Sequence, residues 1–486
     1  MHGYRRQLRK EKIAILSAKV NKTIAAGEGE TQPVIQRIVA ASIALWGLAL
    51  LLAHPILYER DDGFWWGWGA LCIVGCYSLF SVKNVCGRLR LLHVVGPMVA
   101  IALLSLLLSQ QWGNVALLDL LARVGLLWLS FVIARDPIAR RILAYALVAG
   151  SVIVCAYAFL QSRGLDPLPS ATPFDGRRIV ATFENPNYLG NFAACAFPVL
   201  LAIFFSPGRT LERSVVGTAA VLSYGACILA GSRGAWIAGL GGIAVVLAGG
   251  VLAVRRGEIR LRWSSLSILV LALLGTTYVA TCDPIIANSR GKVSAGERLF
   301  SAFYLFSPHG KVEEGAPANT SATSMQVGDI QVNDTTINHR YFIWQVAWAM
   351  AQDRPVLGVG YGEFASQFPR YRDDLRDGAW YGSLIGSQQM EDTRYAHNEL
   401  LHLWAECGLL GLLAFAWMVG CVGWVLLDHL RCGVSLYMWA LVAALSVMLI
   451  HSQVSYPLHL PFNGMIFWVC AGLGLGYQRE EATTLP

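Results

Sequence analysis

Long apolar runs separated by short polar segments recur along most of this 486-residue chain. Each run has roughly the 17 to 25 residues that an α-helix needs to cross the hydrocarbon core of a bilayer. The pattern therefore predicts an all-α integral membrane protein with about twelve transmembrane helices. The runs are Ile38–Leu57, Phe64–Val82, Leu91–Leu108, Val115–Ala134, Ile142–Leu160, Leu189–Phe205, Val215–Ala230, Ala235–Val254, Leu266–Thr281, Leu400–Leu427, Leu436–Ile450 and Phe462–Tyr477.

Most of the polar segments that are rich in Lys and Arg fall on one side of the predicted membrane. If the basic N-terminus is cytoplasmic, nearly every short loop rich in Lys or Arg falls inside, as positive-inside topology requires. The connection from Asp283 to Thr393 then lies outside. The run from Leu400 is too long for one crossing and contains Gly408, so we expect it to tilt or to begin in an outer-face cavity.

This threading predicts five consecutive regions. Residues 1–34 form a cytoplasmic N-terminal arm, and residues 35–282 hold transmembrane helices 1 to 9. A large outer loop covers residues 283–396, with an amphipathic helix near 338–352. Transmembrane helices 10 to 12 occupy residues 397–478, and a short cytoplasmic tail covers 479–486.

Composition agrees with a membrane protein, since 55% of residues are hydrophobic and 14% are charged. The net charge of +7 follows from inner loops that face anionic lipid, and it requires no nucleic acid. Most of the eleven cysteines lie in apolar runs or inner loops, which implies no disulfide framework.

Polar motifs that are far apart in sequence gather on the predicted outer side. Guanidinium groups there would form a cradle for a diphosphate, because each offers two donors and stays charged. A histidine beside them would act as a base, since imidazole titrates near neutral pH. The candidates are Arg178, Asn185, Asn187, Ser232, Arg233, Arg340, Trp344, His397, Asn398 and Tyr456.

Each candidate also has a simpler interpretation. Arg233 would snorkel or pair with a carboxylate, and His397 would be structural. The asparagines would cap or shape loops, because Asn commonly bonds nearby backbone. Arg340 and Trp344, one helical turn apart, would belong to a Trp-anchored helix at the membrane interface.

Other chemistry finds little support in the sequence. The predicted outer face has no Asp-x-Asp pair or His/Asp cluster with metal-ligand spacing, so we expect no metal and no cofactor. The predicted inner side has no phosphate-binding glycine loop. This argues against an ATP-driven pump and against a metal-dependent transferase that uses a soluble nucleotide-sugar. A donor carried in the lipid fits better.

Several of these motifs resemble the O-antigen ligase and O-antigen polymerase superfamily of bacterial inner-membrane proteins. The likeness runs from about Thr182 to the C-terminus. The matching pieces are Phe183-Glu184-Asn185-Pro186-Asn187, Gly231-Ser232-Arg233-Gly234, Arg340 with Trp344, Pro355-Val356-Leu357-Gly358-Val359-Gly360, His397-Asn398 with Glu406, Gly408 and Gly411, and Tyr456-Pro457-Leu458.

The resemblance implies a metal-independent transferase of lipid-linked glycans with a class-C glycosyltransferase-like architecture. Such a protein has a large periplasmic loop over a lipid-facing cavity, a cytoplasmic N-terminus and a periplasmic active site. By position, Arg233 and Arg340 would hold the donor's undecaprenyl diphosphate. His397 would deprotonate or orient the acceptor hydroxyl.

The acceptor remains open at this point. Lipid A-core would make the protein an O-antigen ligase, which is our leading interpretation. A second lipid-linked glycan would make it a polymerase, and a protein Ser or Thr would make it an O-oligosaccharyltransferase. Outside the enzymes, a membrane transporter also suits twelve spans. However, the span interiors carry few charges, chiefly Asp119 and Arg123, which we interpret as a buried pair.

Overall fold

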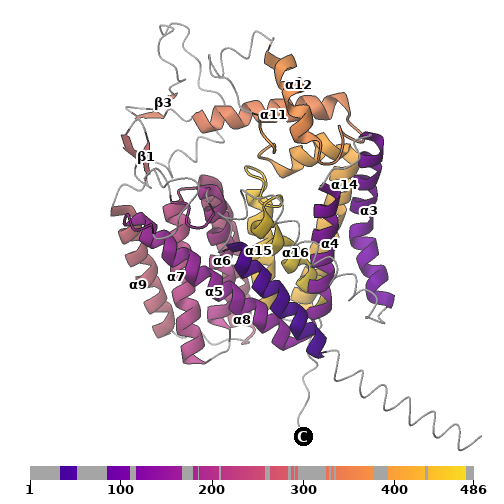
Figure 1. Cartoon of the computed structure of the whole chain (residues 1–486). Helices are drawn as coiled ribbons and strands as arrows, with labels where there is room; N and C mark the ends of the chain where they lie inside the picture. The colour runs from indigo at the N-terminus through magenta and orange to yellow at the C-terminus, as the bar shows by residue number, and fades with distance from the viewer. Residues whose placement is uncertain are drawn as a thin grey trace, which may run out of the picture.

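The computed structural model describes a helical bundle with a smaller helical layer across one end (Figure 1). The described residues are 33–51, 85–109, 116–166, 179–183, 185–206, 209–257, 263–282, 286–288, 291–293, 325–327, 330–332, 335–376, 392–432 and 436–477. The N-terminal arm up to residue 32, the predicted span Phe64–Val82, Arg178 and the tail from residue 478 lie outside this part of the chain.

Helices fill most of the described chain, and every predicted run that falls on described residues coincides with one of them. Seven of the described helices are long and apolar enough to cross a membrane, and others are shorter but equally apolar. The protein is therefore a multi-pass membrane protein. The bundle helices are Pro33–Leu51, α3 Val85–Ser109, α4 Ala116–Ile133, α5 Pro137–Ser162, α6 Pro186–Phe205, α7 Thr210–Ala230, α8 Arg233–Arg255, α9 Trp263–Cys282, α14 Glu399–Cys432, α15 Leu436–His451 and α16 Pro461–Gly476.

Helix α6 lies at the centre of the bundle, where it packs on α7, α8 and α15. Small residues permit these close approaches. For example, a Cβ atom at Gly242 of α8 would lie 2.5 Å from Val447 of α15. By contrast, α9 lies at the edge (Figure 1) and leaves apolar side chains such as Ile268 and Leu271 68% exposed. A surface of this kind requires a hydrocarbon environment.

The layer at one end consists of α11, Thr335–Asp353, and α12, Phe364–Arg376, which share a small hydrophobic core with the start of α14 (Figure 1). Helix α11 occupies the stretch for which the sequence predicts an amphipathic helix. Its residues Phe342, Ile343 and Val346 are buried in this core. Trp348 is 43% exposed and meets Trp404 of α14 edge-on at 5.1 Å.

Two short antiparallel hairpins also lie in the long connection, and the sequence did not predict them. They join β1 Ile286–Asn288 to β2 Gly291–Val293, and β3 Met325–Val327 to β4 Ile330–Val332. Each strand has three residues, which is too short for an alternating pattern to stand out.

The over-long run from Leu400 is explained by a break at Gly408, whose φ of 64° interrupts α14. The segment Pro355–Gly360 lies in this break. Val359 N donates to the Ala405 carbonyl at 2.8 Å and Leu409 N donates to the Pro355 carbonyl at 2.8 Å. Two glycine-bearing motifs, far apart in sequence, therefore fix the layer of α11 and α12 to the bundle.

Replacing Gly408 by alanine is expected to destabilise the protein by about 2 to 5 kcal/mol. A Cβ atom there would lie 2.1 Å from the Val356 carbonyl carbon, and the positive φ would be strained as well. Gly420→Ala is the matched control, because it lies in the same helix with nothing within 4 Å of the new methyl. Thermal unfolding in detergent should show a large loss for Gly408→Ala only, and equal midpoints would contradict this packing.

Candidate active site

The hairpin between α7 and α8 places Arg233 at a helix N-terminus. Gly231 ends α7 in a left-handed conformation (φ 61°), Ser232 is the N-cap residue of α8, and Arg233 is its first residue. Arg233 is only 9% exposed. A cation at the positive end of a helix dipole is unfavourable by itself, so the two together favour an anion nearby.

Gly234 brings this hairpin against the end of α15. A Cβ atom at Gly234 would lie 3.1 Å from His451 Nε2 and 2.6 Å from Val454. On the other side of the ring, Asn191 Nδ2 of α6 lies 2.6 Å from His451 Nδ1. His451 is buried. The end of α15 and the turn after it, residues 451–455, therefore contact both α6 and α8. These residues are called the turn of residues 451–455.

The same turn holds the start of α14. Glu399 N donates to the Ser452 carbonyl at 2.8 Å, and Asn398 Nδ2 donates to the Gln453 carbonyl at 3.0 Å. Asn398 Oδ1 also accepts from Leu401 N, as an N-terminal cap does. The turn thus contacts Gly234, which follows Arg233, and Asn398, which follows His397.

His397 lies in this junction in a strained backbone conformation. Its φ of 54° is unusual for a residue with a side chain, and such strain is typical of functional sites. Its Nδ1 atom is buried and has no hydrogen-bond partner among the described residues. Its ring meets Tyr456 edge-on at 4.7 Å.

Arg340 of α11 completes the arrangement. Its charge acts on both His397 and His451, so α11 brings a second guanidinium to the same turn. Burial, followed by the charges of Arg340, His339 and His402, lowers the pKa of His397 to about 3. His397 is therefore neutral at physiological pH, in surroundings that favour an added negative charge.

The supporting candidates lie at the start of α6, on α11 and just after this turn. Asn185 is the N-cap residue of α6, where its Oδ1 accepts from Asn187 N at 2.9 Å. The interpretation of Asn185 and Asn398 as capping residues is thus confirmed. Tyr456 OH lies 2.6 Å from Tyr188 OH of α6. Trp344 lies on α11, and within the described part of the chain its buried Nε1 has no hydrogen-bond partner.

Sequence reasoning missed two histidine–carboxylate pairs beside His397. His459 Nδ1 lies 2.7 Å from Glu399 Oε2, and His402 Nε2 lies 3.4 Å from Glu406 Oε1. The i,i+4 spacing of His402 and Glu406 was a usable signal. Nothing in the sequence could pair Glu399 with His459. Asn191, a lone amide in an apolar run, was also a usable signal.

In the predicted pair Asp119–Arg123, Arg123 is buried and Asp119 is largely covered. Arg123 Nε lies 2.5 Å from Asp119 Oδ2, and Arg123 Nη2 donates to the His459 carbonyl at 3.2 Å. The pair therefore fastens α4 to the segment before α16.

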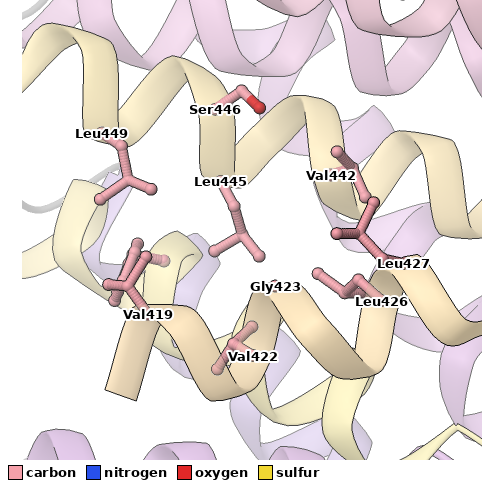
Figure 2. A pocket seen from close by; sticks show the side chains of 10 residues that line it. Val419, Val422, Gly423, Leu426, Leu427, Val442, Leu445, Ser446 and Leu449 are labelled. Atoms are coloured by element: carbon pink, nitrogen blue, oxygen red, sulfur yellow. The ribbon is translucent and has the colours of Figure 1, made fainter. Parts of the chain in front are cut away.

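A separate cavity of about 150 Å³ lies between α14 and α15, with Phe467 of α16 on one side. Figure 2 shows its lining, in which Ser446 is the only hydroxyl among aliphatic side chains. It contains none of the candidate site residues. Such a lining suits hydrocarbon and offers little to a sugar or a phosphate. No group of His, Cys, Asp or Glu in the described chain has an arrangement that would hold a metal ion.

Comparison with known proteins shows a similarity over part of the chain. Residues 218–416 match the sequence profile of the O-antigen ligase family, and this segment contains Arg233, Arg340 and His397. Over this segment the chain is similar to the O-antigen ligase family. This similarity supports a polysaccharide-related membrane protein.

A second similarity is to a curated bacterial protein. The chain is 25% identical over 296 residues to the exopolysaccharide production protein ExoQ of Rhizobium meliloti (strain 1021). The match covers 60% of this chain and 56% of that protein, so it spans little more than half the length of the relative.

Proposed function

We propose that the protein transfers a glycan from undecaprenyl diphosphate to an acceptor hydroxyl at the periplasmic face of the bacterial inner membrane, without a metal. One observation carries this proposal. Arg340 acts on His397 and His451 together, and His451 packs against the glycine that follows Arg233. These contacts support a site near the end of α15 at which one neutral imidazole and two guanidinium groups, from three different elements, come together.

In the proposed reaction, the acceptor oxygen attacks the anomeric carbon while the bond from that carbon to the diphosphate breaks. The diphosphate leaves with the bonding electrons, and the hydroxyl proton passes to the imidazole of His397. Arg233 and Arg340 stabilise the charge that develops on the leaving group more than the charge already present, which lowers the barrier. Arg178 would add a third guanidinium.

The leading acceptor is lipid A-core, in keeping with the O-antigen ligase family. The similarity to an exopolysaccharide production protein favours a second candidate, in which the acceptor is another lipid-linked glycan and the product is a polymer. A protein Ser or Thr is the third possibility. In each case the threading puts the N-terminus in the cytoplasm and the outer layer in the periplasm.

Deletion of the gene in its host tests the proposal and separates the acceptors. Lipopolysaccharide core without any polymer would identify a ligase. Core with a single repeat, or loss of secreted polysaccharide, would identify a polymerase. If lipopolysaccharide, secreted polysaccharide and glycoproteins are all unchanged, and reconstituted protein moves a solute without lipid-linked glycan, the protein is a transporter.

The low pKa of His397 gives a pH prediction. Protonation inactivates a base, so activity should fall as the pH drops through the His397 pKa, which is about 3 in the free protein. Bound diphosphate adds negative charge and raises this pKa. The acidic limb of kcat should therefore lie at higher pH than the acidic limb of kcat/KM. Coincident limbs would contradict a diphosphate bound beside His397.

A further inference from the structure

The segment that carries Tyr456 is fastened to the residues that follow His397 by one buried carboxylate. Glu399 Oε1 accepts from Leu458 N at 2.8 Å, and Glu399 Oε2 faces His459 Nδ1 at 2.7 Å. Glu399 is buried and lies two residues after His397. Because both of its oxygens face the same loop, Glu399 ties the start of α14 to the segment before α16.

Aromatic rings continue this connection back to His397. The His459 ring lies 5.0 Å from the Tyr395 ring, and Tyr395 stacks on Tyr456 at 4.5 Å. Tyr456 meets His397 edge-on at 4.7 Å. Contacts therefore connect Glu399, two residues after His397, through His459, Tyr395 and Tyr456 to the His397 ring. The ring of His397 is thus positioned by groups that bind neither a diphosphate nor a sugar in the proposed function.

We infer that Glu399 and His459 are positioning residues, which act as one unit to hold Tyr456, and through it His397, in the geometry for transfer. This inference rests on the proposed function of His397. The backbone of His459 is held as well, because the His459 carbonyl accepts from Arg123 of α4. The pair therefore joins α4, α14 and the segment before α16 at one point.

The charge of the pair depends on pH. Burial and Arg123 lower the pKa of His459, but the adjacent Glu399 carboxylate outweighs them and raises it. The pair is therefore charged below the His459 pKa and loses its attraction as the pH rises through it. The groups that face His459 are Glu399, His402 and Glu406 on α14, Arg123 with Asp119 on α4, and Tyr395.

The test compares wild type, Glu399→Gln, His459→Gln and the double variant in liposomes. The donor is the lipid-linked glycan extracted from the gene-deleted host, and transfer is followed from pH 5 to 9. We expect kcat to fall about tenfold in each single variant with little change in the donor KM. In Glu399→Gln the alkaline limb should move to lower pH by about one pH unit or more, because the carboxylate that keeps His459 protonated is gone.

The double variant should be no worse than either single variant, because residues that act as one unit do not add. Glu363→Gln is the matched control. Glu363 is also a buried carboxylate, just before α12, and its Oε2 accepts from Ser366 Oγ. Its pH profile should match that of wild type.

Two results would overturn the inference. A Glu399→Gln protein whose folded fraction drops while its pH profile keeps the wild-type limbs would show a purely structural role. Losses that multiply in the double variant would show two independent residues. If wild type transfers no lipid-linked glycan, the proposed function itself fails and the inference falls with it, which the wild-type arm alone reveals.

Discussion

Replacement of His397 by alanine is expected to lower glycan transfer at least about a hundredfold, because general-base catalysis contributes that much. The protein should still fold and insert, since His397 Nδ1 makes no hydrogen bond to any residue that the structure describes, and the segment is held by its neighbours Asn398 and Glu399. Transfer by purified protein, with the lipid-linked donor in liposomes, measures the effect.

His93→Ala is the control for this substitution. His93 is exposed on α3, where its ring meets Trp417 of α14 edge-on, and it takes no part in the site. It should transfer glycan at the wild-type rate. Near-normal transfer by His397→Ala would remove His397 as the base.

Replacement of Arg233 by alanine is expected to raise the barrier by on the order of 3 kcal/mol, a loss of about a hundredfold or more in kcat. A positioned donor beside the developing charge acts mainly on the transition state. Arg233→Lys should fall between wild type and alanine, because lysine keeps the charge but lacks the planar pair of donors.

Helix α8 provides its own control, since it begins at Arg233 and ends at Arg255. Arg255 is exposed at the opposite end, so Arg255→Ala should insert normally and transfer at the wild-type rate. Equal losses in the two variants would indicate an effect of arginine on insertion or stability. Such a result would contradict a role for Arg233 in catalysis.

The bundle was predictable because a membrane constrains sequence strongly. A spanning helix must be long and apolar, so run length and loop charge predicted the described helices closely. The break at Gly408 was only partly predictable. The glycine and the excess length indicated an irregularity, but the backbone of Pro355–Gly360 that fills the break is distant in sequence and left no periodic signal.

The cations and the histidine of the candidate site were predictable. Charged groups beside a membrane are costly, so those that are present usually serve a function. Arg233, Arg340 and His397 were selected on that ground. The packing that joins them was not predictable. It depends on Gly234 meeting His451 and on Asn398 meeting Gln453, which are contacts across helices that no local pattern encodes.

The second group of ionisable residues was missed for the same reason. Glu399 lies inside a motif that already seemed explained by His397 and Asn398. His459 lies sixty residues further on, and its partner becomes evident only when α14 and α16 are side by side. Pairings of this kind depend on tertiary structure, whereas a single charge in an apolar run can be recognised in the sequence alone.

The most direct test of the central claim is a cryo-electron microscopy structure of the protein with undecaprenyl diphosphate bound. The account predicts diphosphate density beside the turn of residues 451–455, within hydrogen-bonding distance of Arg233 and Arg340, with His397 adjacent to it. Diphosphate bound elsewhere on the protein, with either arginine turned away from it, would contradict the account.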